Sequence, residues 1–172
     1  MAVIFDQMVI IGVGLIGGSL GMAVRKHGLA DKVVGIDLDE NSLQMAKELG
    51  AVDTYALDYS PVRDADLVVL AAPIFSNLKI LENIRGYLAP QAVVTDVGST
   101  KSEFVAQAEQ LLPNNAFVGG HPMAGAETAG VGGADPYLFE NAFYLLTPTE
   151  TTDPQALGRV RNLVEGVGAR AL

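Results

Sequence analysis

The 172-residue sequence contains no cysteine and only two histidines, His27 and His121. The absence of cysteine excludes disulfides, thiolate nucleophiles and zinc sites built on cysteine. Two histidines also argue against a multi-histidine metal site. We therefore expect chemistry that needs neither a thiol nor a metal ion.

Positive charge is scarce as well: 11 lysines and arginines stand against 20 aspartates and glutamates, for a formal net charge of −9. Binding of nucleic acid depends on clustered cations, so this balance argues against such a partner. Residues 8–24 carry no charge, but Asp6 precedes them, no basic region flanks their start, and five glycines interrupt them. Signal segments and membrane spans have other flanks. We predict a cytoplasmic protein with no membrane partner.

Hydrophobic residues make up 49% of the chain and charged residues 18%, which is typical of a globular protein. Apolar runs alternate with helix-like segments, which predicts one α/β domain over residues 1–172 with a Rossmann-like, doubly wound, mostly parallel sheet and helices on both faces. Less regular strands are expected near the C-terminal end. The expected strands are 8–11, 32–36, 66–71, 92–97, 117–119, 142–146 and a last one from 169; the expected helices are 15–26, 40–49, 74–88, 102–112 and 154–167, with a glycine-rich loop over 120–136.

A dinucleotide-binding motif follows the first expected strand. Gly12, Gly14 and Gly17 form G-x-G-x-x-G, with Leu15 and Ile16 opening a helix inside it. The glycines permit a tight turn, close approach of the backbone to a pyrophosphate, and close packing of helix on strand. The unpaired N–H groups of the helix N-terminus suit phosphate. The motif therefore predicts a dinucleotide cofactor.

Asp37 ends the second expected strand, 20 residues after Gly17. A carboxylate there accepts hydrogen bonds from the adenine ribose and repels a 2′-phosphate, so we expect NAD in preference to NADP. The alternative is a solvated acid in a turn. Ala72 and Pro73 follow the third long strand, where a strand-to-helix turn would also contact the cofactor.

Two later strand ends carry candidate reactive residues. Thr100 and Glu103 match a capping box, which leaves Ser99 free to point into a site. Lys101 has two interpretations, contact with an anionic ligand or an ordinary surface lysine. His121 follows a short strand and opens the long loop, as a general base or as a turn cap.

Four segments together resemble the prephenate/arogenate dehydrogenase family: GVGLIGGSL (12–20), VVGID (33–37), DVGSTK (96–101) and, most specifically, GGHPMAGAETAG (119–130). The resemblance implies NAD(P)-dependent oxidative decarboxylation of prephenate or arogenate on the route to tyrosine. His121 would then match the catalytic histidine, Ser99 a serine near the nicotinamide and substrate, and Glu127 an acid of the active-site loop. Ala126 departs from members that carry threonine there.

Members of this family continue into a helical domain that dimerises, completes the active site and supplies an arginine for the substrate carboxylate. We expect that domain to be absent from this chain and the full-length protein to be a homodimer. Between Gly86 and Gly158 the only cation is Lys101, against eight acids, so the chain has little with which to bind a dianion. Two alternatives stay open: a non-catalytic NAD-binding module, and a different NAD-dependent hydroxy-acid dehydrogenase.

Overall fold

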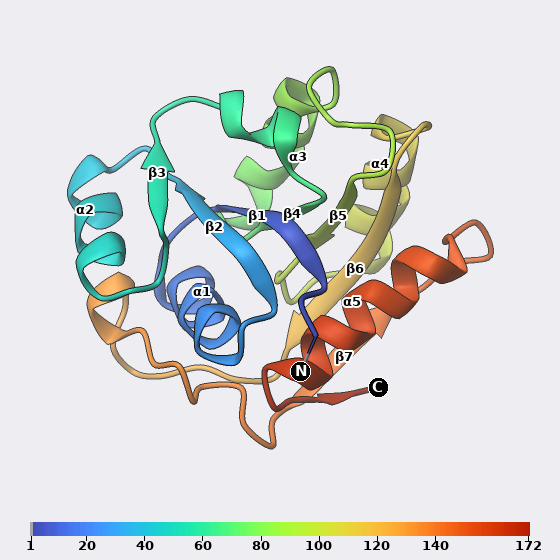
Figure 1. Cartoon of the computed structure of the whole chain (residues 1–172). Helices are drawn as coiled ribbons and strands as arrows, with labels where there is room; N and C mark the ends of the chain where they lie inside the picture. The colour runs from blue at the N-terminus through green and yellow to red at the C-terminus, as the bar shows by residue number, and fades with distance from the viewer. Residues whose placement is uncertain (1) are drawn as a thin grey trace.

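Eight strands form one sheet in the computed structural model of the chain, which describes residues 2–172 (Figure 1). The strand order is β3-β2-β1-β4-β5-β6-β7-β8. The first six of these pair in parallel, β7 runs antiparallel to β6, and β8 runs parallel to β7. The strands are β1 Phe5–Ile11, β2 Ala30–Ile36, β3 Thr54–Ala56, β4 Leu67–Leu70, β5 Val93–Asp96, β6 Ala116–Pro122, β7 Phe143–Thr147 and β8 Arg170–Ala171.

Helices cover both faces of this sheet (Figure 1). They are α1 Leu15–His27, α2 Glu40–Glu48, α3 Ile74–Ile84, α4 Ser102–Leu111 and α5 Pro154–Gly166, with short 3₁₀ turns at Ser60–Asp64 and Val131–Gly133. None of the helices within residues 2–172 is long and apolar enough to cross a membrane.

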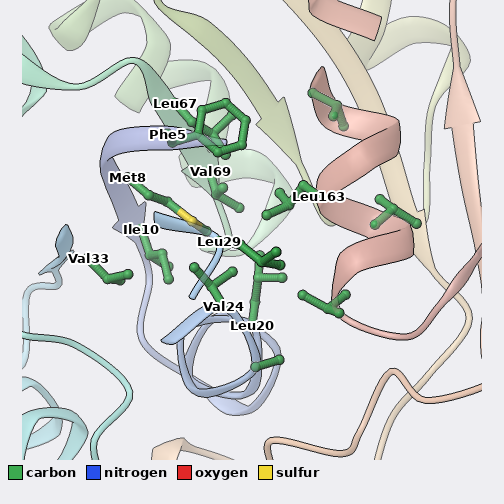
Figure 2. Packing of buried hydrophobic residues seen from close by; sticks show 14 of the residues in the cluster. Phe5, Met8, Ile10, Leu20, Val24, Leu29, Val33, Leu67, Val69 and Leu163 are labelled. Carbon is green, nitrogen blue, oxygen red and sulfur yellow. The ribbon is translucent and has the colours of Figure 1, made fainter. Parts of the chain in front are cut away.

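The apolar strands explain the two layers of helices, because successive side chains of a strand point to opposite faces. Met8 and Ile10 of β1 belong to a core shared with α1, α2 and α5, which also contains Leu20 and Leu163 (Figure 2). Val9 and Ile11, one residue along, belong to a second core shared with α3 and α4. A strand buried on both faces has to be a continuous apolar run, and β4 shows this with four buried residues in four.

The predicted fold class is confirmed, and the differences concern length and short elements. β3 and the 3₁₀ turn at Ser60–Asp64 were not expected from the sequence. Helix α3 ends at Ile84 rather than at 88. Strand β6 runs to Pro122, because β7 offers an antiparallel partner to its last residues, Gly119 to Thr147 and His121 to Leu145. The expectation that His121 lies just after the strand is therefore wrong.

The chain order also fixes where a ligand can bind. From β1 the chain moves outward through β2 to β3, then returns to the other side of β1 as β4. The connections after β1 and β4 leave the sheet in opposite directions, which opens a crevice at the carboxyl ends of these two strands.

Candidate functional site

A cavity of about 650 Å³ occupies this crevice. It is bounded by the ends of β1, β2 and β4 and by one side of α3. The residues that line it are Ile11, Gly12, Gly14, Ile36, Asp37, Leu38, Leu57, Tyr59, Ala71, Ala72, Pro73, Ser76, Lys79, Ile80 and Asn83.

The three motif glycines have different structural roles around this cavity. Gly12 has φ of +99°, and a Cβ there would lie 2.6 Å from the backbone carbonyl carbon of Ala71, so the β1 and β4 connections touch at this point. A Cβ on Gly17 would overlap the carbonyl oxygen of Gly12. A Cβ on Gly14 would meet no atom within 4 Å, although Gly14 lines the cavity. Gly12 and Gly17 are therefore needed for packing, and Gly14 leaves space for a ligand.

The N-terminus of α1 opens beside that space. Gly14 is its N-cap, no side chain caps the helix, and its first turn contains no acid. The N–H groups of Leu15, Ile16 and Gly17 have no partner within the helix, since the first bond of the i→i−4 series runs from Gly18 to Gly14, at 2.8 Å. Leu15 and Ile16 are absent from the cavity lining, so their backbone groups, not their side chains, suit an anion there.

Asp37 stands at the other wall, held by backbone groups on both sides. One carboxylate oxygen accepts the N–H of Val13 at 2.9 Å, and the other accepts the N–H of Asp39 at 3.0 Å. This carboxylate is therefore fixed relative to the glycine loop, with its negative charge at the cavity.

Beyond Asp37 the cavity wall is apolar and is formed by Leu38, Leu57 and Tyr59; Leu38 is 98% exposed. Sequence reasoning missed this stretch, because β3 brings Leu57 and Tyr59 there through pairing with β2.

A second group of polar residues lies at the ends of β5 and β6. Asp96 ends β5 and has no solvent exposure. Its Oδ2 accepts the N–H of Gly98 at 2.9 Å and contacts the Lys101 ammonium, and its Oδ1 accepts the N–H of Gly120 at 3.1 Å. Burial raises the pKa of the Asp96 carboxyl, and Lys101 and the two N–H groups oppose this. Burial likewise lowers the pKa of Lys101. Asp96 was not among the predicted site residues. The sequence does carry a pattern that indicates such an ion pair, because an acid ends a buried apolar strand five residues before a lysine.

This arrangement corrects two predictions. The capping box at Thr100 and Glu103 is wrong, because Lys101 is the N-cap of α4 without a side-chain cap bond, and Glu103 accepts a hydrogen bond from Gln107. Lys101 is not an ordinary surface lysine, since its side chain is 13% exposed and pairs with Asp96. The anion that it meets belongs to the protein itself.

The candidate catalytic residues lie on neighbouring strand ends. Ser99 is exposed in the loop between β5 and α4, and His121 is half-buried near the end of β6. In the described part of the chain the imidazole of His121 takes part in no hydrogen bond, so a turn-capping role has no support. Glu127 is exposed on the loop that follows β6. That loop then returns over α1, where Val131 is buried against the first turns of the helix.

The predicted residues therefore fall into two groups. Gly12, Gly14, Asp37, Ala72 and Pro73 line one cavity, with Gly17 packed directly behind it. Ser99 and His121 do not line this cavity; Ser99 follows the end of β5, and His121 lies in the last residues of β6, the next strand along the same sheet.

The strand order, the glycine loop and the fixed acid after β2 define a dinucleotide-binding domain of the Rossmann class. Residues 20–172 match the family model described as "Prephenate dehydrogenase, nucleotide-binding domain". The chain belongs to this family, and the predicted resemblance is confirmed.

Individual relatives agree with the family assignment. The prephenate dehydrogenase of Bacillus subtilis (strain 168) is 41% identical over 167 residues, which are 95% of this chain and 45% of that protein. The crystal structure of Synechocystis arogenate dehydrogenase matches with a TM-score of 0.91 and 37% identity, over 96% of this chain and 58% of that one. Prephenate dehydrogenase from A. aeolicus, in complex with hydroxyphenyl propionate and NAD+, matches with a TM-score of 0.92 and 35% identity, over 97% and 59%. The chain thus spans roughly half the length of these relatives.

Proposed function

We propose that this chain binds NAD and forms the cofactor-binding part of a dehydrogenase that oxidatively decarboxylates prephenate or arogenate in tyrosine biosynthesis. The observation that carries the proposal is that three features share one edge of the sheet. The glycine loop directly follows β1, the fixed Asp37 carboxylate directly follows β2, and His121 lies near the carboxyl end of β6. The relatives named prephenate and arogenate dehydrogenase support the same activity.

The cavity suits NAD on three counts. Gly14 leaves open space beside uncapped N–H groups, which fits a pyrophosphate. Asp37 is held where it can accept the ribose hydroxyls, and its charge would repel a 2′-phosphate. Lys79 also lines the cavity, but its side chain is exposed and takes part in no ion pair within residues 2–172. The fixed acid outweighs an exposed lysine, so NAD is preferred to NADP.

NAD bound in this cavity would accept a hydride from the substrate. His121 would accept the proton of the substrate hydroxyl at the imidazole, as its place on β6 and the family motif around it suggest. Ser99, exposed in the neighbouring loop, would hydrogen-bond the substrate or the nicotinamide. Glu127 belongs to the loop that follows His121 and has the weaker role of a substrate contact.

The substrate carboxylates need a cation, and residues 86–158, which contain Ser99 and His121, offer no free one. Between Gly86 and Gly158 the only lysine or arginine is Lys101, which is bound to Asp96. Carboxylates are usually held by arginine. The proposal therefore places the carboxylate-binding group in a further part of the intact protein or in a partner chain.

The deciding experiment mixes this chain with NAD and with prephenate or arogenate, and follows NADH formation and NAD binding in one sample. Binding without turnover supports a cofactor-binding part that needs another segment. Turnover would overturn the charge argument, and a lack of NAD binding would overturn the proposal. The intact protein is proposed to be a cytoplasmic homodimer, which ultracentrifugation and cell fractionation would check.

A further inference from the structure

Asp96 and Lys101 form an ion pair that is almost fully removed from solvent. The Asp96 side chain has no exposure and that of Lys101 has 13%. Neither residue lines the cofactor cavity, and neither side chain makes a capping hydrogen bond to α4. A buried ion pair in such a place requires a reason beyond solubility or cofactor contact.

The partners of the Asp96 carboxylate suggest that reason. Its Oδ2 accepts the N–H of Gly98 at 2.9 Å, and its Oδ1 accepts the N–H of Gly120 at 3.1 Å. Gly98 directly precedes Ser99, and Gly120 directly precedes His121. One carboxylate therefore connects the two loops or strand ends that carry the candidate reactive residues, each through the residue just before it.

We propose that Asp96, with Lys101 as its counter-charge, is a positioning residue that fixes the backbone of Ser99 and His121 relative to one another. The consequence for catalysis rests on the proposed function; the structural connection does not. Lys101 serves this arrangement instead of contacting substrate.

The backbone at Gly98 and Gly120 is packed closely around the Asp96 carboxylate. A Cβ on Gly120 would lie 2.6 Å from the carbonyl oxygen of Asp96 and 3.0 Å from Cε1 of the buried Tyr144. A Cβ on Gly98 would lie 3.0 Å from Oδ2 of Asp96. Glycine at both positions lets the backbone N–H groups approach the carboxylate closely.

The energetics agree with a positioning role. Burial raises the pKa of Asp96 and lowers that of Lys101, and in each case it outweighs the attraction of the partner. Buried ion pairs of this kind contribute little net stability compared with apolar side chains of similar volume. Their value lies in geometry, here two charge-assisted hydrogen bonds to backbone groups, one just past the end of β5 and one on β6.

The test compares two variants of the chain with a matched control. Asp96→Asn keeps one acceptor oxygen but cannot accept both N–H groups, and it leaves Lys101 unpaired. The double variant D96N/K101M makes the same change without leaving a buried charge, so it serves if D96N does not fold. Thr95→Val is the control, because Thr95 also connects β5 to β6, donating from its buried hydroxyl to the Val118 carbonyl at 2.6 Å, without contacting Gly98 or Gly120 by a hydrogen bond.

Amide hydrogen exchange is measured by NMR for Gly98 and Gly120, relative to Val34 in the centre of β2 as a reporter of global unfolding. We expect the exchange of one or both glycines to rise about tenfold relative to Val34 in D96N or the double variant, and to stay unchanged in T95V. Glycine amides that follow Val34 in every variant, or a T95V effect equal to that of D96N, would overturn the connection.

Activity of the intact protein then tests the consequence. We expect the double variant to lower kcat about ten- to a hundredfold with little change in KM for NAD, as a misplaced catalytic group would. An exchange effect with unchanged kcat would overturn the positioning role. A wild-type protein that turns over neither prephenate nor arogenate would instead overturn the proposed function, while the exchange result would stand.

Discussion

The backbone N–H of Val13 donates to the Asp37 carboxylate at 2.9 Å, which ties the glycine loop after β1 to the end of β2. One side chain thus helps to shape the pyrophosphate site and presents the charge that would select the ribose.

Replacing Asp37 with Asn should weaken NAD binding about ten- to a hundredfold and reduce the preference for NAD over NADP. The amide keeps one acceptor but loses the charge that repels a 2′-phosphate, and it cannot accept from both Val13 and Asp39. Titration of the variant with NADH and NADPH, followed by nucleotide fluorescence, measures both effects. Asp31→Asn is the matched control, with the same change of charge on the exposed start of β2. Equal losses for both nucleotides would contradict the selective role of Asp37.

The cofactor half could be predicted from the sequence because its signals are local. The three glycines, the apolar strand before them and the acid at the end of the next strand lie within residues 8–37. They specify one β-α-β unit whose geometry depends little on the rest of the chain. The structure accordingly places Gly12, Gly14 and Asp37 in one cavity.

The region around His121 could not be predicted in the same way, because it depends on long-range pairing. β6 reaches His121 only because Leu145 of β7 pairs with it. The Lys101 side chain does not cap α4, because it forms a largely buried ion pair with Asp96. Neither relationship leaves a periodic signal in a single sequence, whereas a capping-box pattern at Thr100 is local and proved misleading.

The motif glycines allow a test that separates ligand binding from folding. Gly14→Ala should change the free energy of unfolding by less than about 1 kcal/mol, because its φ is −74° and a Cβ would meet no atom within 4 Å. It should nevertheless weaken NAD binding, since that space is where the pyrophosphate would lie. Gly17→Ala should destabilise the fold strongly, because its Cβ would overlap the Gly12 carbonyl oxygen.

Thermal unfolding and NAD titration of both glycine variants measure the contrast. Wild-type affinity in Gly14→Ala would place the pyrophosphate elsewhere. A fully stable Gly17→Ala would show that the β1 connection can shift to admit a methyl group.

Lys101→Met should lower the free energy of unfolding by about 3–5 kcal/mol at pH 7, because Asp96 stays buried without its cation. The pKa of Asp96 is already raised by burial, and loss of Lys101 raises it further. A raised folded-state pKa gives stability that is present below the unfolded value and is lost as pH rises through the folded value. The free-energy cost of the substitution should therefore decrease as the pH is lowered toward the pKa of the aspartate carboxyl in the unfolded chain, about 4.

Tyr144 is a further titratable group near Asp96, and its raised pKa keeps it neutral throughout this range. Urea unfolding of wild type and variant at pH 7 and pH 5 measures the difference. A cost that does not change between these conditions would mean that Asp96 does not titrate with the pair.

His121→Asn in the intact protein should abolish turnover while sparing NAD binding. Asn is of similar size but cannot take a proton near neutral pH, and a positioned general base contributes about 10²–10⁴-fold to rate. The half-buried imidazole takes part in no hydrogen bond within residues 2–172, so its loss should change the free energy of unfolding by less than about 1 kcal/mol. His27→Asn is the control, since His27 ends α1 far along the chain from the β6 edge. NADH formation with saturating NAD, together with a separate NAD titration, distinguishes the outcomes: unchanged turnover in His121→Asn would assign the base to another residue, and equal losses in both histidine variants would point to a general defect of folding.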